Sequence, residues 1–141
     1  MKLELPAGGW GLRPYQKALW QYLQNGGTRA CVLWPRRHGK DDVALNWAAC
    51  AAMRRPGAYW HMLPEATQAR KAIWDAVDPH SGLRRIDKAF PMAMRETTRD
   101  TDMFLRFVNG STWQVVGSDR YDSLVGTSPA GIVFSEWALA D

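Results

Sequence analysis

Residues 33–42, "LWPRRHGKDD", decide the fold because they place a Gly-Lys pair between two different hydrophobic patterns. The run before the pair, "RACVLW" at 29–34, is short, apolar and partly β-branched or aromatic, which predicts a buried strand. After the pair, residues 40–55 are predicted to form a helix that is stopped by Pro56-Gly57. A strand, a glycine-containing turn and a helix in this order form the context in which backbone N–H groups bind phosphate.

The rest of the chain continues the alternation of helices and strands. An amphipathic helix begins near Pro14 and stops at Gly26-Gly27, and Asn109-Gly110 is a preferred type I′ turn pair between two apolar runs. The other predicted elements are strands at 58–63, 103–108, 112–117 and 131–136, a helix at 65–77 and a short helix within 83–90. This pattern predicts one α/β domain over 1–141, with a mainly parallel sheet flanked by helices and an inserted β-hairpin.

Composition narrows the class of protein. A chain of 141 residues with 46% hydrophobic content is sufficient for one packed core, and Trp47 and Trp113 are expected to belong to it. No apolar stretch approaches the roughly 20 residues that cross a bilayer, and the N-terminus lacks a secretory signal, so a cytoplasmic location without membrane contact is expected. Cys31 and Cys50 are predicted to be buried free thiols. A net charge of +4 permits a polyanionic partner.

The Gly39-Lys40 pair departs from the standard phosphate loop, GxxxxGK[ST], at two positions. Trp34 stands where the first glycine is expected, and Asp41 stands where the loop normally has a Mg²⁺-binding hydroxyl. The alternative interpretation is a solvated basic turn, with Asp41 and Asp42 simply favouring the positive end of a helix.

A second stretch bears on the same chemistry. In P-loop ATPases with an additional strand, an apolar run ends in Asp-Glu, which places one carboxylate near the metal and the next near the attacking water. "GIVFSEWA" supplies the apolar run and Glu136, but has Ser135 where the Asp is expected. Alternatively, Glu136 is an ordinary surface residue at the end of a strand.

Five stretches in order resemble the large subunit of tailed-phage terminases, the ATP-driven motors that package DNA: "LRPYQ", "PRRHGKD", "MLPEATQARKAIWD", "NGSTWQVVGSDRYDSLVG" and "GIVFSEWALAD". The resemblance implies a P-loop NTPase-like fold, ATP and Mg²⁺ as cofactors, and Walker A and Walker B elements. It implies that Gln16 reads the adenine, that Arg36 contacts the γ-phosphate, that Lys40 binds the β- and γ-phosphates and that Glu136 activates water. Arg37, His38 and Gly39 would contribute to the phosphate loop, although Arg37 and His38 are equally compatible with solvated loop residues.

The same resemblance implies which partners the complete motor has and which part of the motor this chain corresponds to. The complete motor would act as a homo-oligomeric ring in the bacterial cytoplasm, with double-stranded DNA, a terminase small subunit and a portal protein as partners. In the resembled fold a further strand lies between the strands at 29–34 and 131–136, and a nuclease domain follows. The chain is therefore expected to be the N-terminal part of the ATPase domain with an incomplete sheet, a groove between those two strands, no nuclease domain, and weak or no ATP hydrolysis. A helicase-like DNA translocase and a non-catalytic basic DNA-binding adaptor are the alternatives.

The two departures from the standard motifs are complementary. The hydroxyl after the lysine has become the carboxylate of Asp41, and the carboxylate of the acidic strand has become the hydroxyl of Ser135. Mg²⁺ accepts either group in its near-octahedral shell, so the exchange conserves the charge of the site. We therefore expect Asp41 to ligate the metal and Ser135 to support it. Two independent losses in a decaying motor are the alternative.

Overall fold

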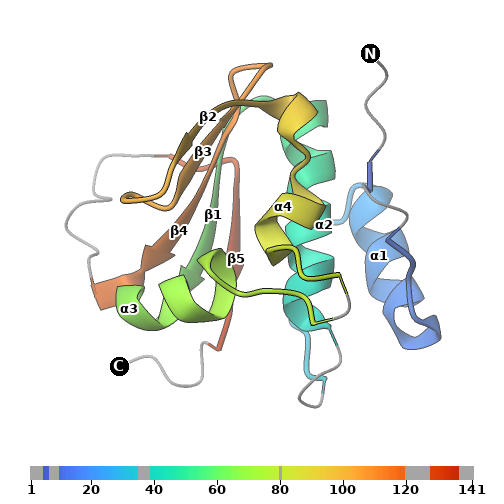
Figure 1. The fold of residues 1–141 in the computed structure, drawn as a ribbon. Coiled ribbons are helices and arrows are strands. Elements are labelled where there is room, and N and C mark those ends of the chain that lie inside the picture. The colour runs from blue at the N-terminus through green and yellow to red at the C-terminus, as the bar shows by residue number, and fades with distance from the viewer. Residues whose placement is uncertain (1–4, 7–9, 35–38, 80, 120–127, 137–141) are drawn as a thin grey trace.

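The computed structural model describes residues 5–6, 10–34, 39–79, 81–119 and 128–136 as an α/β structure with one sheet (Figure 1). The strands are β1 (Ala58–Leu63), β2 (Arg95–Arg99), β3 (Phe104–Phe107), β4 (Thr112–Gly117) and β5 (Gly131–Phe134), in the order β2-β3-β4-β1-β5. The helices are α1 (Lys17–Gln24), α2 (Lys40–Arg54), α3 (Ala66–Ala69) and α4 (Arg85–Ala89), and the shorter helical segments are η1 (Pro14–Gln16), η2 (Arg70–Trp74) and η3 (Met92–Met94). In this part of the chain, no helix is both long and apolar enough to cross a membrane.

The sheet is mixed, so the expectation of a mainly parallel sheet is wrong. β1 pairs in parallel with both β4 and β5, whereas β3 pairs antiparallel with both β2 and β4. The antiparallel half comes from the predicted hairpin and from β2, which was not predicted. The parallel half is the one in which three strands end at the same edge of the sheet, where ligands bind in open α/β folds.

The strand predicted at 29–34 is absent. These residues form no β-ladder in the described structure, Cys31 is exposed and the side chain of Leu33 is 90% exposed. A strand needs the backbone hydrogen bonds of a neighbour, and among the described residues no strand pairs with 29–34, while β5 pairs directly with β1. The expected groove between 29–34 and the last strand is therefore not a feature of this sheet. Cys50, in contrast, is buried as predicted.

The hairpin between β3 and β4 is confirmed, but its turn is of a different type. Gly110 has a φ of 91° while Asn109 is not among the residues with positive φ. The N–H of Gly110 donates to the carbonyl of Phe107 at 3.0 Å, and the N–H of Phe107 donates to the carbonyl of Ser111 at 2.8 Å. This is a three-residue connection that ends in a left-handed glycine, and not the two-residue type I′ turn, which needs positive φ at both positions.

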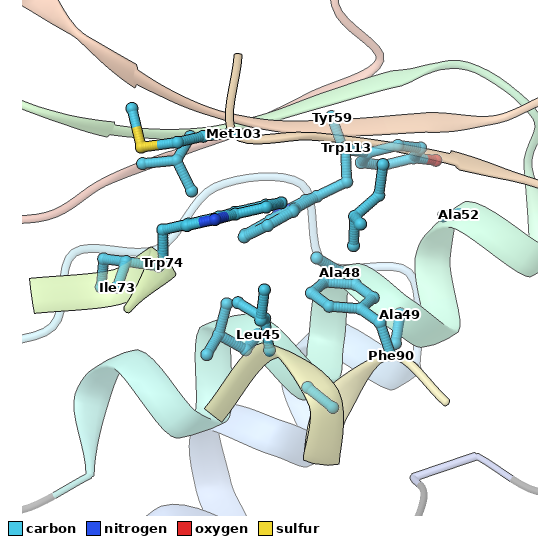
Figure 2. Close-up of a cluster of buried hydrophobic side chains, with 14 of the residues drawn as sticks. Leu45, Ala48, Ala49, Ala52, Tyr59, Ile73, Trp74, Phe90, Met103 and Trp113 are labelled. Carbon is cyan, nitrogen blue, oxygen red and sulfur yellow. The ribbon is translucent and has the colours of Figure 1, made fainter. Parts of the chain in front are cut away.

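The core lies between one face of the sheet and the helical layer (Figure 2). Trp113 from β4 is 1% exposed; its ring stacks on Trp74 of η2 at 6.4 Å between centroids and contacts the ring of Phe90 at 4.6 Å. Helix α2 approaches this layer through small residues, Ala48, Ala49 and Ala52, all at most 2% exposed. The prediction that Trp113 packs in the core is confirmed, and Trp47 packs partly buried against the same cluster.

Candidate functional site

Helix α2 begins at the Gly-Lys pair, as the sequence predicted. Gly39 is the N-cap with a left-handed φ of 73°, and the helix has no side-chain cap at its N-terminus. A Cβ at Gly39 would lie 2.7 Å from Nε2 of Gln16, the end of a flexible side chain that would have to shift, so the left-handed backbone is the main reason for glycine here. Asp41 and Asp42 occupy the first turn, where the helix dipole favours negative charge.

Asp41 and Ser135 come together although they are 94 positions apart in the sequence. The hydroxyl of Ser135 donates to Oδ1 of Asp41 at 2.9 Å. This contact is possible because β5 lies next to β1 and because the N–H of Ser135 donates to the carbonyl of Met62, which continues the ladder one residue beyond β5. The start of α2 and the end of β5 therefore meet at the carboxyl edge of the parallel strands.

A histidine that the sequence did not single out completes this contact. His61 lies in β1 and is 0% exposed, and its Nε2 is 3.3 Å from Oδ1 of Asp41. Strand alternation puts Tyr59, His61 and Leu63 on one face. The hydroxyl of Tyr59 reaches the end of α2, where it donates to the carbonyl of Arg55 at 2.7 Å and lies 3.2 Å from the carbonyl of Ala51. The available signal was this period of two, which places a histidine on the apolar face that α2 covers.

The carboxyl of Asp41 titrates below its ordinary range. Burial raises its pKa, but the hydrogen bond and charge interaction with His61, the hydrogen bond from Ser135 and the positive charge of Arg85 together outweigh burial and lower the pKa. Asp41 is therefore held as a carboxylate, which is the form that ligates a cation.

The lowered pKa of Asp41 predicts the pH dependence of its contribution to stability. A group whose pKa is lower in the folded than in the unfolded state stabilises the fold above its unfolded pKa, about 3.9 for Asp, and loses that contribution as the pH falls through the folded value. We expect the free energy of unfolding of wild type to exceed that of Asp41→Asn at pH 6, and the difference to shrink toward pH 3, measured by urea denaturation at each pH. A difference that grows toward pH 3 would contradict the direction of the shift.

The other predicted site residues are placed as follows. The ammonium group of Lys40 donates to the carbonyl of Trp34 at 3.1 Å, so it lies against the segment that precedes the loop. Gln16 is 2% exposed, and its side-chain carbonyl accepts a hydrogen bond from the N–H of Arg13 at 2.9 Å. Glu136 is exposed and has a left-handed φ of 55°. The predicted contacts of Arg36, Arg37 and His38 lie outside the described residues.

The oxygen groups at this site suit a Mg²⁺ ion that is also bound by nucleotide phosphates better than a metal ion that is bound by protein ligands alone. Within the described residues, no group of three or more His, Cys, Asp and Glu side chains is placed to hold a metal. Mg²⁺ in nucleotide sites usually has only one or two carboxylate ligands and takes the others from phosphates and water. One carboxylate and one hydroxyl, from Asp41 and Ser135, fit that pattern.

Comparisons of the chain with protein-family models, with curated proteins and with solved structures gave no match. The functional assignment therefore depends on the sequence motifs and on the geometry described above.

Proposed function

We propose that this chain is an ATP-binding part of a terminase-type DNA-packaging motor. The observation that carries the proposal is the 2.9 Å contact between Asp41, directly after the Gly-Lys pair, and Ser135, directly after β5. These are the two positions that share one metal ion in P-loop ATPases, and both depart from the standard motif residues. The alternative, in which the Gly-Lys turn is only a solvated basic turn and Glu136 only a surface residue, gives no reason for Asp41 and Ser135 to be in contact.

In this proposal each residue of the site has a separate role. Lys40 would leave the carbonyl of Trp34 and bind the β- and γ-phosphates of ATP. The N–H groups of the first turn of α2, which have no acceptor within the helix itself, would face the same phosphates. Asp41 would ligate Mg²⁺, with Ser135 in support, and Glu136 would orient or deprotonate the attacking water. Arg36 at the γ-phosphate and Gln16 at the adenine keep the roles that the resemblance implies.

ATP with Mg²⁺ supplies the phosphoryl group whose transfer drives such motors. The residues of this chain bind the phosphates, hold a carboxylate in its charged form and place the acidic Glu136 next to Ser135. The duplex DNA would be held mainly through its phosphates and hence without sequence specificity. A ring of subunits, a small subunit and a portal protein are the partners proposed with this function.

Nucleotide binding by the Lys40→Ala variant tests the proposal. We expect the 141-residue chain to bind a fluorescent, non-hydrolysable ATP analogue in the presence of Mg²⁺. Lys40→Ala should weaken the binding about 10-fold or more, because hydrogen bonds to charged groups contribute roughly 1.5–3 kcal/mol. Lys71→Ala, at an exposed lysine of η2, removes the same charge away from the site and should leave the affinity unchanged.

Two outcomes would reject the proposal. The first is no Mg²⁺-dependent binding by wild type, which the DNA-binding adaptor alternative predicts. The second is equal affinity in the Lys40→Ala and Lys71→Ala variants, which would reduce the signal to general attraction between a basic protein and an anion.

A further inference from the structure

The two carboxylate oxygens of Asp41 have different surroundings. Oδ1 accepts from the hydroxyl of Ser135 at 2.9 Å and lies 3.3 Å from Nε2 of His61. Within the described residues, Oδ2 has no hydrogen-bond partner. The side chain of Asp41 is 29% exposed, so one side of the carboxylate is held by the protein and the group still reaches solvent.

The contact with Asp41 defines which nitrogen of His61 carries a proton. A carboxylate oxygen only accepts, so Nε2 must be the donor. Nδ1 of His61 is buried without a hydrogen-bond partner in the described part of the chain. Among the described residues, the ring therefore has a single polar contact, which is to Asp41, and a side chain that is 0% exposed does not reach a ligand in solvent itself.

We infer that His61 is a positioning residue of the metal–nucleotide site, which acts by fixing the carboxylate of Asp41 so that Oδ2 is the oxygen offered to the metal of MgATP. This inference rests on the proposed function. A carboxylate with only one donor can rotate about its terminal torsion, which is broad in aspartate. Donors from two strands, Ser135 after β5 and His61 in β1, remove that freedom. Residues that hydrogen-bond a metal-binding side chain in this way typically change metal affinity 10- to 100-fold when mutated.

A pair of amide substitutions separates this role from simple packing. In His61→Gln the amide nitrogen stands near the place of Nε2 and can still donate to Asp41. In His61→Asn the amide nitrogen corresponds to Nδ1 and falls short. Both variants put an uncharged amide at the same buried position, so they should lower the free energy of unfolding by similar amounts. Met62→Leu, at the 6% exposed neighbour on the opposite face of β1, is the control for a core substitution in this strand.

The measured quantity is the factor by which Mg²⁺ tightens binding of the fluorescent ATP analogue, taken from titrations in MgCl₂ and in EDTA. Wild type, Met62→Leu and His61→Gln should share a similar factor, and His61→Asn should lose about 10-fold of it. The EDTA affinities should remain alike, because Lys40 and the helix N-terminus are unchanged. Thermal unfolding of each variant establishes that the folded protein is being titrated.

The possible results separate the role of His61 from the proposed nucleotide-binding function. A wild type whose binding shows Mg²⁺ dependence and is lost in Lys40→Ala, together with equal Mg²⁺ factors in His61→Gln and His61→Asn, would overturn the role of His61 and leave the proposed function standing. A wild type without such binding would overturn both. A lower Mg²⁺ factor in His61→Asn alone supports the inference.

Discussion

Replacement of Ser135 by aspartate will destabilise the chain at neutral pH, and replacement of Asp41 by threonine in the same molecule will reverse much of that loss. The hydroxyl of Ser135 is 2.9 Å from Oδ1 of Asp41. A carboxylate in its place would remove a donor and set two negative charges side by side, which two carboxylates tolerate only if one takes up a proton. We expect a loss of about 2 kcal/mol or more in the free energy of unfolding at pH 7, measured by urea denaturation.

The same variants form a double-mutant cycle for function. Asp41→Thr and Ser135→Asp should each weaken Mg²⁺-dependent nucleotide binding, and the double variant, which restores the standard arrangement of hydroxyl and carboxylate, should recover much of it. Ser128→Asp adds the same charge at an exposed position and should have little effect on either measurement. Additive losses in the double variant would leave two independent losses in a decaying motor as the better explanation.

Truncation of Trp113 will have a large effect on stability. The indole is 1% exposed, stacks on the ring of Trp74 and contacts the tilted ring of Phe90, so Trp113→Ala leaves a cavity in the core. We expect a loss of about 3–5 kcal/mol in the free energy of unfolding, a large part of the 5–15 kcal/mol typical of a domain.

Trp60→Ala is the matched control for this loss. Trp60 lies in β1, next to β4, and is only partly buried, so its truncation removes the same atoms from the opposite face of the sheet. The loss should be clearly smaller than for Trp113→Ala. Equal losses in the two variants would contradict the assignment of the core to the face covered by α2 and η2.

Elements with a strong local pattern were predicted well. The helix after the Gly-Lys pair, the strand at 58–63 and the hairpin about Asn109-Gly110 match α2, β1 and the β3–β4 pair. The segment 29–34 is equally apolar but forms no strand in the described structure, because a strand needs a hydrogen-bonded neighbouring strand, which composition does not reveal. β2, "RETTR", was missed for the opposite reason: an edge strand with polar side chains has no apolar alternation to detect.

The site was predicted in part. The proximity of Asp41 and Ser135 followed from treating two motif departures as one exchange, and the 2.9 Å contact agrees with it. His61 was missed because the strand alternation places it on the covered face without showing what it contacts, and its relation to Asp41 exists only once β1 and α2 are packed together. The turn preference of Asn109-Gly110 was recognised, but loop length decided the turn type.

The left-handed backbone of Glu136 has a consequence for any attempt to stabilise this protein. A non-glycine residue at a φ of 55° costs roughly 1–2 kcal/mol, and glycine would not. A redesign guided by folding energy alone would therefore select Glu136→Gly and erase the one acidic side chain proposed to act on water. Backbone strain can accompany function, so a redesign that is meant to keep the proposed role of Glu136 should leave this residue unchanged.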